Sequence, residues 1–175
     1  MYNPRMRTPT RPAVRRLTRA LLLSAAVVVS ACESRNVQTD LSIVEVRTGW
    51  YDLGVVAEGQ TKIVPSISLK LKNVSEKPIS GVQIDAVFRS VKEPDKIIDE
   101  HFVPGVASNA SLAPGDSTAP IVLRSKWGFT GSETRSQMLQ NSQFVDAQVT
   151  ILGRHGRNNW ATMSEVQIDR RLLTN

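Results

Sequence analysis

Apolar and polar residues alternate one by one along several segments of this 175-residue chain. Residues 67–71 place Ile, Leu and Leu on one face, and residues 82–88 and 145–151 repeat the pattern. A period of two is typical of strands with one buried and one solvated face, as in antiparallel sheets. The alternation predicts a core that includes Val82, Ile84, Phe88, Val149 and Ile151.

Turn-forming residues separate these segments, for example Ser75-Glu76-Lys77-Pro78 and Ala113-Pro114-Gly115-Asp116. Further strands are expected at residues 41–47, 97–103, 118–124 and 160–169. Seven or eight short strands in residues 41–175 predict an all-β fold, an antiparallel β-sandwich. One short helix is expected, with Ser132 as its N-cap and Met138 and Leu139 facing inward. Pro65 cannot donate a hydrogen bond to a sheet, so we expect it at an edge or a bulge.

The first 31 residues differ from the rest of the chain. They contain six arginines and no acidic residue, and these arginines account for the whole formal net charge of +6. Residues 20–31 are uncharged, but a bilayer-spanning helix needs about 20 apolar residues. A basic segment followed by a short apolar one predicts an export signal that is cleaved. Since the remaining residues are neutral overall, no nucleic-acid partner is expected.

The signal ends in Val29-Ser30-Ala31-Cys32, which resembles the lipobox of bacterial lipoproteins. The resemblance implies cleavage after Ala31, a diacylglycerol on Cys32 and a further acyl chain, such as palmitate, on the new amino terminus. Cys32 is the only cysteine, whereas a structural cysteine in an exported domain normally has a disulfide partner. A transmembrane anchor, or an apolar N-terminus with an unrelated cysteine, is the alternative.

Three regions are therefore expected. Residues 1–31 form the signal peptide, residues 32–40 the lipidated N-terminus with a flexible tether, and residues 41–175 the sandwich. The protein is expected in the cell envelope, anchored to a membrane on its periplasmic side. Glu33 follows Cys32 in place of the aspartate of the enterobacterial inner-membrane rule, which favours the outer membrane.

Two segments of the mature region resemble FxLYD-type domains, which are small immunoglobulin-like sandwiches of prokaryotic surface proteins and lipoproteins. Residues 71–82 (LKNVSEKPISGV) are similar to the strand, turn and strand that open these domains, and residues 112–117 (LAPGDS) to a later turn. The motif that names the family is only partly present in residues 85–89 (DAVFR). The resemblance implies an immunoglobulin-like topology and no catalytic residues.

Few residues offer chemistry. Asp99 and His101 share a strand face, which would suit a polar surface or the start of a metal site. His155 lies beside Arg154 and Arg157 in a predicted turn, where it would be solvated or would contact phosphate. No motif of a known hydrolase, metalloprotease or nucleotide-binding loop occurs, so neither an enzyme nor a cofactor is expected.

Residues 125–142 form an unusually long connection for a compact sandwich, and such loops are often functional. Trp127 and Phe129 lie in it beside Gly128 and Gly131, and they are the candidate contact patch. Either the domain itself covers these two aromatics, or a partner does. We favour cover by the domain.

The sequence as a whole predicts a non-enzymatic, lipid-anchored module that contacts an unknown envelope protein or polymer. The sheet edges and loops of a sandwich are recognition surfaces, which supports this reading. Alternatives are an envelope hydrolase and a lipoprotein that binds a small ligand.

Overall fold

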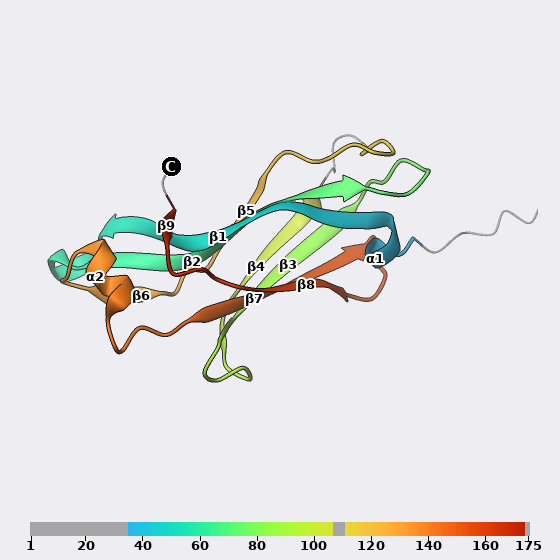
Figure 1. Ribbon diagram of the computed structural model, residues 1–175. Helices are drawn as coiled ribbons and strands as arrows, with labels where there is room; N and C mark the ends of the chain where they lie inside the picture. Colours follow the sequence, from blue (N-terminus) through green and yellow to red (C-terminus); the bar gives the residue numbers. More distant parts are fainter. Residues whose placement is uncertain (1–34, 107–110, 174–175) are drawn as a thin grey trace, which may run out of the picture. The chain divides into compact units, whose positions relative to one another are not determined.

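Two long strands organise the fold. In the computed structural model, which describes residues 35–106 and 111–173, β1 (Leu41–Val55) and β2 (Thr61–Asn73) form an antiparallel hairpin (Figure 1). The first sheet has the order β5-β2-β1-β9, and β6 also pairs with β2. Its shorter strands are β5 (Ile121–Arg124), β6 (Phe129–Gly131) and β9 (Leu172–Leu173). The export signal and Cys32 lie outside the described residues.

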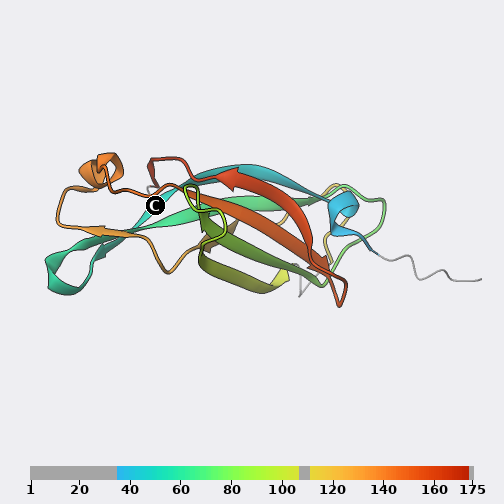
Figure 2. The same cartoon turned by 90° about the horizontal axis from the view of Figure 1, so that it is seen from below.

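The second sheet has the order β4-β3-β7-β8, with antiparallel pairing throughout. Its strands are β3 (Val82–Ser90), β4 (Ile97–Val106), β7 (Ala147–His155) and β8 (Ala161–Gln167). The two sheets face each other (Figure 2), and one hydrophobic core joins residues of both. The predicted all-β sandwich is confirmed. The five predicted core residues are all buried, namely Val82, Ile84, Phe88, Val149 and Ile151.

The described residues contain nine strands, two short α-helices and one 3-10 turn, more than the sequence predicted. The main difference is β1, which continues to Val55 where we expected a strand only to residue 47. Thr48, Gly49 and Trp50 are all buried, so the period of two is lost there. The cause is burial on both faces: a side chain at Gly49 would meet Leu173 of β9, while Trp50 contacts Phe144.

The predicted helix is present as α2 (Arg135–Gln140), and Met138 and Leu139 are buried as expected. Its N-cap is Thr134 and not Ser132. Gln137 lies three residues after Thr134, and its side-chain oxygen accepts hydrogen bonds from the Thr134 backbone N–H at 3.1 Å and hydroxyl at 2.7 Å. This T-x-x-Q capping box is visible in the sequence and outweighs the serine two residues earlier.

Pro65 lies in β2, which is paired on both sides, and not in an edge strand. Its carbonyl accepts a hydrogen bond from Ser125, just after β5 ends. Since the N and C=O of one strand residue point to the same side, the missing donor of Pro65 faces the break between β5 and β6. The sheet is therefore interrupted where the proline requires it.

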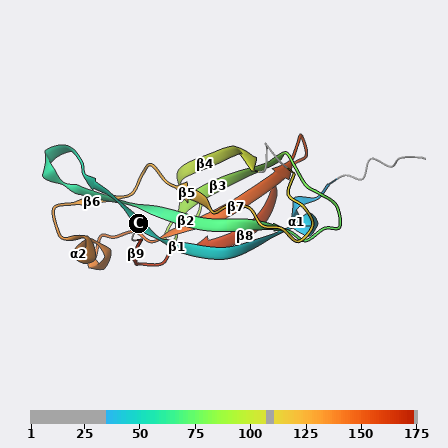
Figure 3. The same ribbon diagram turned by 90° about the horizontal axis from the view of Figure 1, so that it is seen from above.

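The N-terminal end of the described chain also differs from the expected tether. Residues 35–40 are folded against the sandwich, since α1 (Val37–Asp40) follows Arg35 and Val37 is buried. α1 and α2 lie at opposite ends of the β1–β2 hairpin (Figure 3). Among the described helices, none is long and apolar enough to cross a membrane.

Candidate functional site

A pocket of about 280 Å³ opens beside the β5–β6 break. One wall comes from the first sheet and the β5–β6 segment, and the other from β4 and the segment before β7. The apolar lining residues are Trp50, Pro65, Ile98, Trp127, Phe129 and Val145. The turn between β3 and β4 supplies a charged rim with Lys92, Glu93 and Lys96.

The path of the chain from residue 125 to 129 positions the aromatic wall. The Ser125 hydroxyl donates to the Trp127 carbonyl at 2.8 Å and accepts from the Trp127 N–H at 3.0 Å, which fixes a tight turn. Gly128 then passes so close to β2 that a Cβ atom would overlap the carbonyl of Ile63. Only glycine fits this approach, and the turn leaves the Trp127 ring at the surface.

The two aromatics of the predicted contact patch both line the pocket but differ in exposure. Phe129 is half-buried and lies 5.3 Å from Phe144, measured between ring centroids. Trp127 is 64% exposed, and within residues 35–106 and 111–173 its one ring contact is a cation–π interaction with the Lys62 ammonium, 5.4 Å from the ring centroid. The prediction that the domain covers both side chains is thus correct for Phe129 and wrong for Trp127. The reason is the close contact of Gly128 with the backbone of Ile63, which draws the chain against β2 and leaves the Trp127 indole in solvent.

Charges beside the pocket are mostly paired. Glu93 forms an exposed ion pair with Lys96 at 3.3 Å, so Lys92 adds a positive charge to the rim. Asp146, next to the lining residue Val145, accepts two hydrogen bonds from Arg170 at 2.6 and 2.9 Å. These hydrogen bonds lower the pKa of Asp146 below its ordinary value of 3.8, with further help from Lys92. The rim therefore favours an acidic or neutral ligand over a cationic one.

The two histidines are not brought together. His101 on β4 and His155 on β7 pair with β3 from opposite sides, opposite Ala86 and Val82. His101 Nδ1 lies 2.9 Å from the Arg124 carbonyl, and Asp99 accepts from the Lys126 N–H at 2.5 Å. Asp99 and His101 thus join the edges of the two sheets, and no group of metal-ligating side chains occurs in residues 35–106 and 111–173.

Asp85 is a further polar residue of interest, on the outer face of the second sheet. The Oδ1 atom of Asp85 is covered and has no hydrogen-bond partner in the structure. Burial raises the pKa of this carboxyl, and the nearby Glu100 raises it further. Phe102, its partner residue on β4, forms an edge-to-face pair with Trp160 at 6.0 Å between centroids. The alternation showed that Asp85 faces outward, but it gave no sign of this aromatic neighbourhood.

Comparisons with known proteins give little more. No family model and no curated protein matches the chain. Three solved structures show a distant likeness. A Northeast Structural Genomics Consortium target is 12% identical, with a TM-score of 0.45 over 76% of this chain and 89% of that one. A Bordetella pertussis protein described as ApaA has 14% identity, a TM-score of 0.40 and coverage of 75% and 94%. A protein from Archaeoglobus fulgidus has 18% identity, a TM-score of 0.40 and coverage of 75% and 100%.

Proposed function

We propose that this chain is a lipid-anchored, non-enzymatic binding module of the bacterial cell envelope. The observation that carries the proposal is the lipobox-like Val29-Ser30-Ala31-Cys32 at the end of a short basic export signal. Two or more acyl chains at Cys32 would hold the domain on a membrane, because each buried CH₂ contributes about 0.8 kcal/mol and one chain alone is marginal. The domain would face the periplasm, with the outer membrane favoured by Glu33.

The pocket supports a binding role. Trp127 stands exposed at its edge on a backbone that Ser125 and Gly128 fix, so little conformational freedom is lost when a partner covers the ring. Large aromatics beside apolar pockets are the residues that dominate protein interfaces. The volume of about 280 Å³ lies just below the range of roughly 300–1,000 Å³ that is usual for small-molecule sites. It suits an apolar side chain of a protein partner, with an acidic group near Lys92.

A small apolar ligand is the second candidate, because the pocket walls are mainly apolar. An envelope hydrolase is less well supported. Its acid and base would have to converge on one cleft, whereas His101 and His155 lie on opposite sides of β3. We also infer, from residues 71–82 and 112–117, a relationship to FxLYD-type domains.

Metabolic labelling with an alkyne fatty acid tests the anchor. The wild-type chain is expected to incorporate the label, and Cys32→Ala is expected to remain an unlabelled precursor. Trp127→Ala serves as the control and should be labelled normally, because it changes the pocket and leaves residues 29–32 intact. Equal labelling of wild type and Cys32→Ala would remove the basis of the proposal.

Photo-crosslinking in the native envelope tests the binding surface. A photoreactive phenylalanine analogue in place of Trp127 is expected to give a discrete crosslinked product. The same analogue in place of Val122, which is 44% exposed on β5, provides the matched control. Identical products at both positions would show random contact and speak against a site at Trp127.

A further inference from the structure

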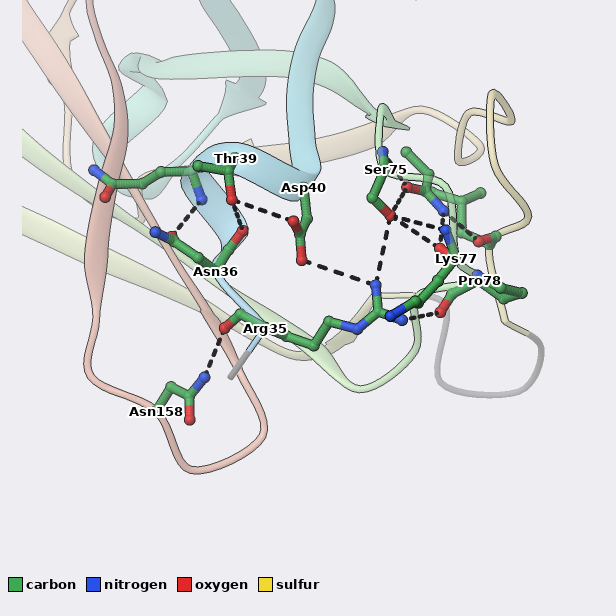
Figure 4. Close-up of polar contacts among 11 residues, drawn as sticks. Arg35, Asn36, Thr39, Asp40, Ser75, Lys77, Pro78 and Asn158 are labelled. Carbon is green, nitrogen blue, oxygen red and sulfur yellow. Dashed lines mark hydrogen bonds and ion pairs between the residues drawn. The ribbon is translucent and has the colours of Figure 1, made fainter. Parts of the chain in front are cut away.

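The chain segment next to the proposed lipid anchor is fastened to the sandwich. The Arg35 guanidinium donates to the Pro78 carbonyl at 3.1 Å and to the Ser75 hydroxyl at 3.5 Å (Figure 4). It also lies 3.8 Å from the Asp40 carboxylate, at the end of α1. One side chain therefore joins the start of the described chain to the turn between β2 and β3.

The backbone of the same segment is held from a second direction. Asn158, in the turn between β7 and β8, donates to the Arg35 carbonyl at 2.8 Å. The Gln38 side chain donates to the Thr162 carbonyl at 2.9 Å, and Val37 is only 5% exposed. Arg35 is thus tied to both sheets at one end of the sandwich.

The turn that receives Arg35 is itself well supported. Asn73 is fully buried, and its amide donates to the carbonyls of Lys77 and Leu112 at 2.9 and 2.8 Å. Its side-chain oxygen accepts from the Ser75 N–H at 2.9 Å and the Ser75 hydroxyl at 2.8 Å. The Asn73 side chain thus uses both of its donors and both of its acceptor positions around this turn, so the acceptors for Arg35 are held in place.

The distance from Arg35 to the membrane is then limited by the sequence. Cys32 precedes Arg35 by three residues, which span at most about 10 Å when extended. This length is comparable to the headgroup region, which is about 5–8 Å thick on each side of a bilayer. A domain fastened at Arg35 has almost no free linker, which contrasts with the flexible tether expected from the sequence.

We propose that the end of the sandwich formed by α1, the turn at residues 75–78 and the turn at residues 155–159 lies directly on the lipid headgroups. The proposal rests on lipidation at Cys32. In this orientation the exposed guanidinium of Arg157, beside Asn158, contacts lipid phosphates. The surface is thus a lipid-facing one, and its ligand is the phosphate of the headgroup.

This orientation also determines where the pocket lies relative to the membrane. Trp50 follows Leu41, the first residue of β1, by nine positions, which correspond to at most about 30 Å at 3.3 Å per residue. The tip of the β1–β2 hairpin, η1 (Ala57–Gly59), lies farther still from α1 (Figure 1). The anchored end rests on the membrane, and the pocket with Trp127 faces the periplasm.

Fluorescence quenching on vesicles tests the orientation. The lipidated full-length protein is reconstituted into vesicles of phosphatidylethanolamine and phosphatidylglycerol that carry a headgroup spin label. A fluorophore is attached at Asn159→Cys, near the anchor, or at Ala57→Cys, at the hairpin tip. Both positions are exposed turn residues, and Cys32 is blocked by its lipid. The Asn159→Cys label is expected to be quenched severalfold more strongly than the Ala57→Cys label.

Two further variants test the role of Arg35. Arg35→Ala should reduce the difference between the two labels, because the domain can then move away from the membrane on a longer linker. Arg135→Ala removes an ion pair with Asp52 at the other end of the hairpin and should leave the difference unchanged. Fatty-acid incorporation is measured on each sample. Lipidated protein with equal quenching at both labels overturns the orientation alone, whereas protein without lipid overturns the anchor and the orientation together.

Discussion

The indole ring of Trp50 lies edge-on against the phenyl ring of Phe144, with ring centroids 4.4 Å apart. Both side chains are almost completely buried, and Phe129 adds a third ring. The Arg170 guanidinium lies 5.0 Å from the Phe144 centroid. These contacts connect the β1–β2 hairpin to the segment between α2 and β7. One aromatic cluster therefore stabilises the part of the sandwich that contains the pocket.

Phe144→Ala should therefore destabilise the protein strongly. Removal of a buried phenyl group costs about 3–5 kcal/mol, because the cavity cannot fully collapse. Urea unfolding of the unlipidated domain measures the change. Phe102→Ala is the control, since Phe102 is 49% exposed and should cost much less. Equal losses for both variants would contradict the importance of the cluster.

Trp127→Ala should leave stability nearly unchanged. The ring is 64% exposed, and its cation–π contact with Lys62 contributes no more than about 1 kcal/mol at such a site. The expected change in the free energy of unfolding is thus below about 1 kcal/mol, and the loss appears in partner crosslinking instead. A drop in melting temperature comparable to that of Phe144→Ala would show that Trp127 is a core residue after all.

Asn73→Asp should be among the most damaging single-atom changes. A carboxylate can still accept from Ser75, but it cannot donate to the carbonyls of Lys77 and Leu112. Each buried group left without a partner costs about 1–3 kcal/mol, and a buried charge costs more. Hydrogen exchange should show faster opening of the turn at residues 75–78. Ser75→Ala, which removes a less buried partner, should have a smaller effect.

The Asp146–Arg170 pair should make stability depend on pH in the acidic range. Because the hydrogen bonds from Arg170 lower the pKa of Asp146, the pair stabilises the fold above the ordinary value of 3.8. This contribution is lost as the pH falls through the lowered pKa of the folded state. Asp146→Asn should therefore flatten the acid limb of a plot of urea midpoint against pH. An unchanged acid limb would show that the pair contributes nothing.

Asp85→Asn should change the pH dependence of stability in the opposite direction. Burial raises the pKa of Asp85, so the folded state binds this proton more tightly than the unfolded chain does. The wild type accordingly loses stability as the pH rises from the unfolded pKa to the raised folded pKa. Asp85→Asn removes this loss and should raise the urea midpoint at neutral pH relative to acidic pH. A decrease confined to neutral pH would refute the assignment.

The sequence predicted the parts of the fold that depend on local alternation. Ile84 and Ile151 are buried because their strands have one face in the core and one in solvent, and a period of two reports this directly. The helix was also foreseen, since Met138 and Leu139 form its buried side. Its start was misplaced because Ser132 was considered without the glutamine that completes the cap at Thr134.

The site was predictable only in part. Trp127 was identified from its place in a long Gly-containing connection, but its exposure depends on the contact of Gly128 with Ile63, which lies 65 positions earlier in the chain. Ile98, on β4, and Val145, just before β7, line the same pocket, with no local signal that they meet. The attachment of Arg35 was missed for the same reason. Its partners Pro78 and Asn158 are distant in sequence, and residues 33–40 on their own are mostly polar and show no period.

The pairing of β9 with β1 has a consequence for how an exported copy would fold. Leu172 and Leu173 pair in parallel with Trp50 and Tyr51, and the Trp50 N–H donates to the Arg171 carbonyl at 2.7 Å. If the chain is exported as proposed, more than a hundred residues would have to emerge from the translocation channel before the edge of β1 could close. Contacts between residues so far apart in sequence form slowly. The chain would therefore stay unfolded while it passes through the channel. A copy clipped before Leu172 would present an open β1 edge to its neighbours, and self-association would be the expected result.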